Sequence, residues 1–159
     1  MFGFRKNKEK VLVAPVTGMV VPLEQVPDAT FAQKVMGDGI AVECHGSEVV
    51  APCAGELSMV SDTKHAFVVT SPEGAEILVH IGIDTVKLKG EGFVQLKAAG
   101  TTVVAGEPII KVNCAFIQSK QLSLATPVVI TNMEIVKKLE KTAMNEVTAG
   151  KSVIMKYST

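Results

Sequence analysis

Glu76-Ile-Leu-Val-His-Ile-Gly-Ile-Asp-Thr85 predicts a buried strand over residues 77–83 that carries one histidine, His80, where an aliphatic residue would normally lie. A second histidine, His65, precedes it in the sequence. Ser71-Pro-Glu-Gly74, between the two, predicts a turn. Two strands joined by this turn would bring the imidazoles together. Such a pair suggests either a metal site or a phosphoryl relay.

Short apolar runs recur along the whole chain, separated by Gly, Pro and Asp. They predict strands at residues 11–14, 19–23, 40–44, 48–51, 57–60, 66–70, 77–83, 93–96, 108–112 and 127–131. Helix signals are few: a turn capped by Asp28, another within 116–124, and a weak pattern at 132–139. We therefore expect an all-β fold, an antiparallel β-sandwich with a few short helical turns.

One short motif occurs twice. Ala14-Pro-Val-Thr-Gly18 and Ala51-Pro-Cys-Ala-Gly55 share their Ala, Pro and Gly. Each copy predicts a strand, a tight turn at the glycine and a second strand. The repeat therefore suggests two similar hairpins on the two halves of one sandwich.

The length of 159 residues suits a single domain, expected over residues 11–159 after a flexible tail at residues 1–10. No apolar run reaches the roughly 20 residues that a membrane helix needs. The first residues carry positive charge without the apolar core of a secretory signal. We therefore expect a cytoplasmic protein with no membrane span.

Charge and composition exclude other classes of function. Sixteen basic and sixteen acidic residues give no net charge, which argues against a nucleic-acid binder. Six Phe, one Tyr and no Trp make base stacking improbable as well. The three cysteines, Cys44, Cys53 and Cys114, are an odd number without a CxxC pair, which indicates buried, reduced thiols.

The surroundings of the two histidines favour a relay over ordinary core packing. Gly82 allows a partner to approach His80 closely, and Asp84 lies near the expected strand end. Thr63 would share a strand face with His65, and its hydroxyl can fix the imidazole tautomer. Phosphoryl transfer needs a neutral imidazole nitrogen, so His80 would be the nucleophile and His65 the stabiliser.

Two alternatives remain open from the residues alone. In a zinc hydrolase, His65 and His80 would need a third ligand, such as Asp84, because catalytic zinc usually has three protein ligands. A biotin- or lipoyl-carrier module would need a modifiable lysine at a hairpin tip between methionines. Met155-Lys156-Tyr157 matches that requirement only in part.

From Ala14 to about Ile154, the sequence resembles the glucose-type enzyme IIA domain of the bacterial phosphoenolpyruvate-dependent sugar phosphotransferase system. The segments that carry the resemblance are Ala14-Pro-Val-Thr-Gly18, Val26-Pro-Asp28, Met36-Gly-Asp-Gly-Ile-Ala41, Val50-Ala-Pro-Cys-Ala-Gly55, Lys64-His-Ala66, Leu78-Val-His-Ile-Gly-Ile-Asp-Thr-Val86, Lys89-Gly-Glu-Gly-Phe93 and Pro127-Val-Val-Ile-Thr-Asn132. The histidine segments are the most specific of these.

The resemblance implies a phosphohistidine carrier. His80 would accept a phosphoryl group from the histidine phosphocarrier HPr and pass it to a cysteine of the enzyme IIB domain of a sugar permease. His65 would steady the phosphoryl group and Thr63 would hold His65. No cofactor is required beyond this transient group, although His65 and His80 could bind zinc. Contact with the permease would bring the protein to the membrane periphery.

The resemblance also implies a partner surface, with ordinary packing or helix capping as the alternative for some of its members. Acidic residues would face basic partners, and apolar residues would form the contact patch: Asp28, Phe31, Val35, Leu78, Asp84 and Val86. Ser61 and Leu78 stand where some relatives carry phenylalanine. We read the chain as a free-standing carrier, with a domain excised from a fused permease as the alternative. The unphosphorylated form would be able to bind transporters or kinases. The sugar is set by the permease.

Overall fold

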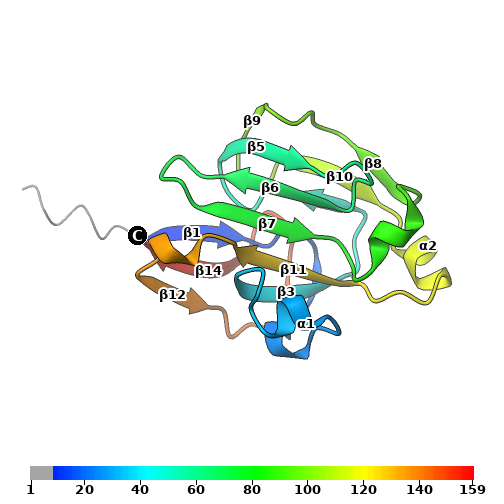
Figure 1. Cartoon of the computed structure of the whole chain (residues 1–159), viewed down its shortest axis with the longest axis horizontal. Coiled ribbons are helices and arrows are strands. Elements are labelled where there is room, and N and C mark those ends of the chain that lie inside the picture. Colours follow the sequence, from blue (N-terminus) through cyan, green and yellow to red (C-terminus); the bar gives the residue numbers. More distant parts are fainter. Residues whose placement is uncertain (1–8) are drawn as a thin grey trace, which may run out of the picture.

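The computed structural model describes residues 9–159 and arranges them in antiparallel sheets (Figure 1). The largest sheet has eight strands in the order β13 (Glu146–Val147), β2 (Gly18–Pro22), β3 (Asp38–Cys44), β11 (Ala125–Ile130), β7 (Glu76–His80), β6 (Ala66–Thr70), β5 (Gly55–Val60) and β9 (Thr102–Val103). A second sheet has three strands in the order β1 (Lys10–Val13), β14 (Val153–Ser158) and β12 (Lys138–Lys141). A third has three strands in the order β4 (Glu48–Val50), β10 (Pro108–Val112) and β8 (Phe93–Gln95). The expected antiparallel β-sandwich is confirmed.

Within residues 9–159, the helical segments are short, with three to six residues each. The elements are η2 (Leu23–Gln25), α1 (Ala29–Ala32), η3 (Thr85–Leu88), α2 (Cys114–Ser119) and η4 (Met133–Ile135). The expected N-cap is confirmed, because the Asp28 carboxylate accepts a hydrogen bond from the Thr30 backbone N–H at 2.9 Å. Of the predicted tail, residues 1–8 lie outside the described residues, and Lys10 already belongs to β1.

The predicted secondary structure needs three corrections. The strand predicted at 77–83 ends at His80, because the chain turns at Gly82, where φ is +72°. The weak helix pattern at 132–139 is the turn η4 followed by strand β12. The sequence reading also missed β14, a six-residue strand that pairs with both β1 and β12, as well as the two-residue strands β9 and β13. Pairing partners far along the chain decide these strands, and local patterns do not show them.

The repeated segments at 14–18 and 51–55 occupy equivalent positions in two similar halves of the sandwich, as the sequence suggested. Val13 donates its N–H to the Pro52 carbonyl at 2.9 Å, and Val50 donates to the Pro15 carbonyl at 2.8 Å. Corresponding positions thus make the same hydrogen bond in opposite directions. The following strands, β2 and β5, each pair at the edge of the large sheet with a short strand, β13 and β9 respectively.

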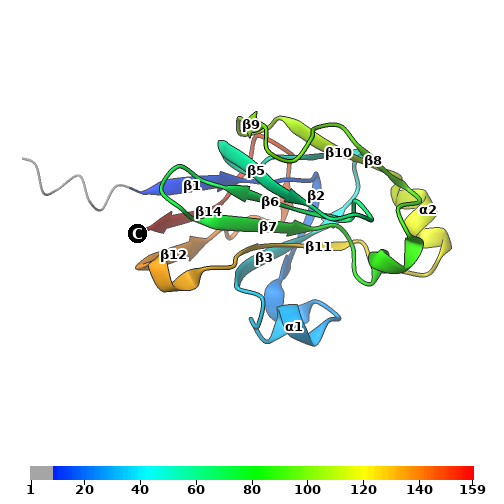
Figure 2. The same cartoon turned by 45° about the horizontal axis from the view of Figure 1, so that its top comes forward.

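Two clusters of buried apolar residues stabilise the packing of the sheets. The larger lies between them and includes Phe67, Ile77, Ile110 and Tyr157, each at most 2% exposed. The smaller lies on the outer face of the large sheet, where the segment of residues 23–36 covers β3, β11 and β7; α1 projects from this face in Figure 2. Because the central strands are covered on both faces, β11 is buried along its whole length.

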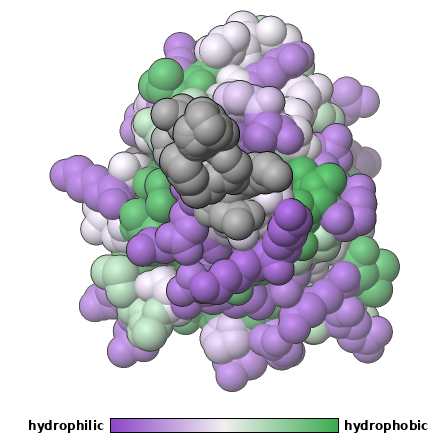
Figure 3. Space-filling model, turned by 90° about the vertical axis from the view of Figure 1, so that its left-hand side faces the viewer, coloured by the Kyte–Doolittle hydropathy of each residue, from purple (hydrophilic) through white to green (hydrophobic). Residues whose placement is uncertain are grey.

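The histidines lie at one end of the β6–β7 hairpin, and the turn at 71–74 lies at the other. Figure 3 shows the side of the molecule around β12 and that turn, which is mostly hydrophilic, with hydrophobic residues in separate patches. The candidate site therefore lies at the end of the hairpin remote from this hydrophilic side.

Candidate functional site

The hairpin of β6 and β7 brings the two histidines together, as the sequence predicted. Ala66 pairs with His80 in the register, and the Ile81 N–H donates to the His65 carbonyl at 2.7 Å. The ring centroids of His65 and His80 lie 4.9 Å apart with an interplanar angle of 83°. The edge of one ring therefore faces the other, and the backbone ladder fixes this arrangement.

A backbone carbonyl sets the tautomer of His80. Its Nδ1 lies 2.8 Å from the Gly82 carbonyl oxygen, and because a carbonyl can only accept, Nδ1 carries the proton. The lone pair of the neutral ring is therefore on Nε2. Gly82 makes this contact possible through its positive φ of 72°, with Thr85 and Ser123 packed too closely for a Cβ. The sequence reading placed Gly82 near the site but missed its carbonyl as the group that orients His80.

Two hydroxyls hold His65. Thr63 Oγ1 lies 2.6 Å and Ser61 Oγ 3.3 Å from Nδ1 of His65. Thr63 was expected to share a strand face with His65. The contact is made in a turn instead, because Lys64 between them has a φ of 62° and β6 begins only at Ala66. The sequence reading treated Ser61 only as a departure from relatives and missed this hydrogen bond.

Burial keeps both imidazoles neutral. It lowers the pKa of His65 to about 4, and the neighbouring His80 adds to the effect. Burial also lowers the pKa of His80, against the opposing influence of the Gly82 carbonyl and of the Asp28 and Asp84 carboxylates. Both rings are therefore neutral near pH 7, the state in which Nε2 of His80 is a nucleophile.

Both Nε2 atoms are accessible from solvent. Neither atom has a hydrogen-bond partner among the described residues. Every fully buried side-chain nitrogen or oxygen among these residues does have a partner, so the two Nε2 atoms are not fully buried. His80 is only partly buried and His65 is about 9% exposed. Each Nε2 is therefore free to meet an incoming group, whereas each Nδ1 is held by a hydrogen bond.

The residues expected to contact partners divide into buried and exposed groups. Phe31 and Leu78 are 3% and 5% exposed and pack in the outer cluster, with the Phe31 ring 5.1 Å from that of His80. Val35 and Val86 are 70% and 51% exposed. The chain itself therefore covers Phe31 and Leu78, and the Phe31 ring packs against that of His80, while the two valines present exposed apolar surface.

The two acidic residues differ in their local roles. Asp28 caps α1 and is partly buried. Asp84 is exposed, has φ of 61° and makes no capping hydrogen bond; its nearest cation is Lys87 at 4.0 Å. Both carboxylates act on His80 electrostatically, so the structure brings them to the same site.

The features required by the two alternatives are not assembled. Within residues 9–159, no group of three or more His, Cys, Asp or Glu side chains is placed to hold a metal ion, so the donor set falls short of a catalytic zinc site. Lys156 lies in the middle of β14, paired with β1 and β12, and not at a hairpin tip as a carrier module requires. No helix in this part of the chain is long and apolar enough to cross a bilayer.

The hairpin places one oriented imidazole with an unbonded Nε2 beside a second neutral imidazole, an arrangement suited to histidine-based group transfer. The model of the family described as phosphoenolpyruvate-dependent sugar phosphotransferase system, EIIA 1, matches residues 10–136. The chain therefore belongs to this family, and the resemblance to glucose-type enzyme IIA is confirmed.

Individual relatives agree with this assignment, two of them over nearly their full length. The chain is 44% identical to a glucose-specific EIIA component of Oceanobacillus iheyensis, covering 95% of this chain and 92% of that protein. It is 42% identical to one of Haemophilus influenzae, covering 98% and 94%. It is also 48% identical to an N-acetylglucosamine-specific EIICBA component of Klebsiella pneumoniae, covering 89% of this chain and 22% of that protein.

A solved structure gives the same result for the fold. The glucose permease IIA from Mycoplasma capricolum superposes with a TM-score of 0.89 at 35% identity, covering 98% of this chain and 99% of that one.

Proposed function

We propose that this protein is a phosphohistidine carrier of the sugar phosphotransferase system, acting in the cytoplasm between phospho-HPr and the enzyme IIB domain of a sugar permease. The observation that carries the proposal is the orientation of His80. Its Nδ1–H is bound to the Gly82 carbonyl, while the Nε2 lone pair is open to solvent beside His65.

In the first transfer, Nε2 of His80 attacks the phosphorus atom of phospho-HPr. An N–P bond forms as the bond to the leaving nitrogen of HPr breaks, and the phosphoryl group moves without redox chemistry. The phosphorylated ring gains positive character, which the Gly82 carbonyl stabilises through the retained Nδ1–H. The second transfer reverses these roles, with a cysteine thiolate of the IIB domain as the nucleophile.

His65 acts as a hydrogen-bond donor to the phosphoryl oxygens. We assign the Thr63 hydroxyl, 2.6 Å away, as the donor to Nδ1 of His65, which places the proton of the neutral ring on Nε2, the atom without a hydrogen-bond partner. Because the pKa of His65 is lowered to about 4, it contributes a neutral donor and binds the group less tightly than a cation would. A carrier benefits from this weaker hold, since the group must leave again.

Partners would dock on the exposed rim of the site. Val35 and Val86 supply apolar contact area, and Asp28 and Asp84 supply negative charge to basic partners. Phe31 and Leu78 would act indirectly, by holding His80 and the outer cluster in place. A patch of this kind fits short-lived complexes, which bury less than about 1,200 Å².

The permease that this protein serves would determine which sugar is transported. The relatives include glucose-specific EIIA components and an N-acetylglucosamine-specific EIICBA component that is much longer than this chain. We propose that this chain serves a permease for glucose or a related sugar, with sugar choice made by the membrane domain. Transfer from the phosphorylated protein to a panel of IIB domains would identify the permease.

The test is phosphorylation in a reconstituted system of phosphoenolpyruvate, enzyme I and HPr. The wild-type protein should acquire one acid-labile phosphoryl group and deliver it to a IIB domain. His80→Ala should not be labelled, and His65→Ala should be labelled but deliver the group slowly. His45→Ala is the matched control, since His45 is exposed and paired with Glu43, and it should behave as wild type. Full labelling of His80→Ala would refute the proposal.

A further inference from the structure

Two cysteine thiols meet at the end of β3, apart from the histidine site. Cys44 is the last residue of β3 and has no exposed surface, whereas Cys114 is the first residue of α2 and is partly exposed. Their Sγ atoms lie 3.2 Å apart, and both cysteines are free thiols. The sequence reading treated them only as separate buried thiols.

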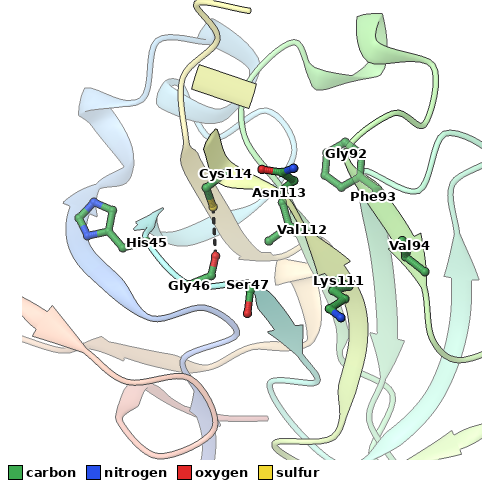
Figure 4. A pocket seen from close by; sticks show the side chains of 10 residues that line it. All are labelled: His45, Gly46, Ser47, Gly92, Phe93, Val94, Lys111, Val112, Asn113 and Cys114. Atoms are coloured by element: carbon green, nitrogen blue, oxygen red, sulfur yellow. Dashed lines mark hydrogen bonds between the residues drawn. The ribbon is translucent and has the colours of Figure 1, made fainter. Parts of the chain in front are cut away.

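Solvent reaches this pair from one side. Cys114 lines a pocket of about 730 Å³ together with polar groups such as Ser47, Lys111 and Asn113 (Figure 4). In Figure 4 its thiol points to the Gly46 carbonyl, at a distance of 3.2 Å. Cys44 lies behind Cys114, with its sulfur 3.7 Å from the same carbonyl. A small solute in the pocket therefore meets Cys114 first.

We propose that Cys44 and Cys114 form a redox-active dithiol that a hydroperoxide converts into an intrachain disulfide. A disulfide bond is about 2.05 Å long, so the two sulfurs must approach by little more than about 1 Å. The backbone is held on the Cys44 side by the hydrogen bond from the Cys44 N–H to the Leu124 carbonyl at 3.0 Å. On the other side, the Asn113 side chain caps α2 by accepting from the Phe116 N–H at 3.0 Å.

The chemistry assigns a different role to each thiol. The Cys114 thiolate attacks the peroxide oxygen, the O–O bond breaks, and Cys114 becomes a sulfenic acid while the peroxide is reduced to an alcohol or to water. The Cys44 sulfur then attacks the Cys114 sulfur, the S–O bond breaks, and water leaves. In total, two thiols lose two electrons and two protons, and one hydroperoxide accepts them.

The surroundings of the two thiols agree with these roles. The hydrogen bond between the two thiols lowers the pKa of Cys114 against the opposing effect of burial, and His45 adds to the lowering. The same hydrogen bond, together with burial, raises the pKa of Cys44. Cys114 is therefore the thiol that ionises first, and Cys44 is held protonated within reach as the resolving thiol.

Cys53 provides the matched control within the same chain. Burial raises the pKa of Cys53 to about 12, and Glu73 adds to this, so Cys53 should react slowly with peroxide. Neither of the other thiols is hydrogen-bonded to it among the described residues.

The experiment treats the reduced, full-length protein with hydrogen peroxide, blocks the remaining thiols with iodoacetamide and maps the peptides by mass spectrometry. We expect a Cys44–Cys114 cross-link that dithiothreitol reverses, a single alkylated thiol at Cys53, and the same cross-link in Cys53→Ser. Cys44→Ser should instead accumulate a dimedone-reactive sulfenic acid on Cys114. Wild-type protein that keeps both Cys44 and Cys114 free, or that over-oxidises Cys114 without a cross-link, would overturn the proposal.

Discussion

The histidine pair and the cysteine pair both begin at the last residue of a central strand, His80 in β7 and Cys44 in β3. In both, the side chain of that residue contacts a carbonyl two residues further along the chain, that of Gly82 and of Gly46 respectively. They differ in where the second member comes from. His65 lies across one hairpin, whereas Cys114 is 70 residues from Cys44. Strand ends thus position reactive groups at short and at long range alike.

The two pairs also differ in how tightly each is fixed. Each imidazole has an anchored Nδ1 and a free Nε2, so the site is oriented before any partner binds. The thiols are held mainly by each other and by one shared carbonyl. Substitutions at anchoring groups should therefore affect the histidine site much more than similar substitutions elsewhere.

The largest effect is expected from Gly82→Ala. A Cβ there would lie 2.7 Å from Thr85 Cγ2 and 2.9 Å from the Ser123 carbonyl oxygen, at a φ of +72°. Strain and overpacking should lower the free energy of unfolding by about 2–4 kcal/mol. Displacement of the carbonyl that orients His80 should slow phosphoryl transfer by roughly 10²-fold. Denaturant unfolding and single-turnover transfer from phospho-HPr measure the two effects.

Gly74→Ala is the matched control for that experiment. Gly74 also has a positive φ, of 100°, but nothing lies within 4 Å of its added Cβ, and it belongs to the turn at the other end of the hairpin. We expect a loss of about 1–2 kcal/mol in stability from strain alone, with the transfer rate unchanged. Equal slowing in both variants would show that the Gly82 carbonyl has no special role.

A smaller effect is expected from Thr63→Val, which removes the hydroxyl on Nδ1 of His65 at 2.6 Å. Loss of one hydrogen bond of about 1–1.5 kcal/mol should slow transfer by about 5- to 10-fold, because His65 is no longer held in one tautomer. Thr70, which lies in the same hairpin, is the matched control: Thr70→Val removes the hydroxyl that is hydrogen-bonded to Ser58 at 2.8 Å. The transfer rate of this variant should stay within about twofold of the wild-type rate. Rapid-quench kinetics on both variants would decide the point.

The difference between the pairs explains how far sequence reasoning could go. A turn motif between two apolar runs predicted the approach of His65 and His80, because those signals act over a few residues. The same signals overextended the strand past His80, since the turn at Gly82 depends on contacts with Ser123 and Thr85. Nothing local to Cys44 or Cys114 indicates their contact, because it arises when β3 and α2 meet in the closed sandwich.

The pH dependence of stability should show the burial of the imidazoles. Because the pKa of His65 falls from 6.5 to about 4 on folding, the unfolded chain binds more protons between these values. The stabilisation is complete above about pH 6.5 and is lost as the pH falls toward 4, by about 1–3 kcal/mol. His80 acts in the same direction. Carboxylates titrate in this range too, so the His65→Gln variant is the reference.

In that comparison, the wild-type protein should lose more stability than His65→Gln between pH 7 and pH 4, as measured by urea midpoints. Parallel curves would mean that His65 is not buried in its neutral form. A phosphoryl-acceptance rate that persists well below pH 6.5 would show that His80 is buried in its neutral form, because that form would then extend to lower pH than in a free imidazole.

The smallest effect on transfer is expected from Cys114→Ser. The cysteine pair is not bonded to either histidine. Its link to the site is the 123–124 segment, where the Cys44 N–H donates to the Leu124 carbonyl and the Ile83 N–H donates to the Ser123 carbonyl, each at 3.0 Å. The serine hydroxyl can still donate to the Gly46 carbonyl, so we expect stability within about 1 kcal/mol of wild type. Transfer should stay within about twofold. A much larger decrease would mean that the segment at 123–124 couples the two pairs, and that strand ends in this fold act together rather than as independent sites.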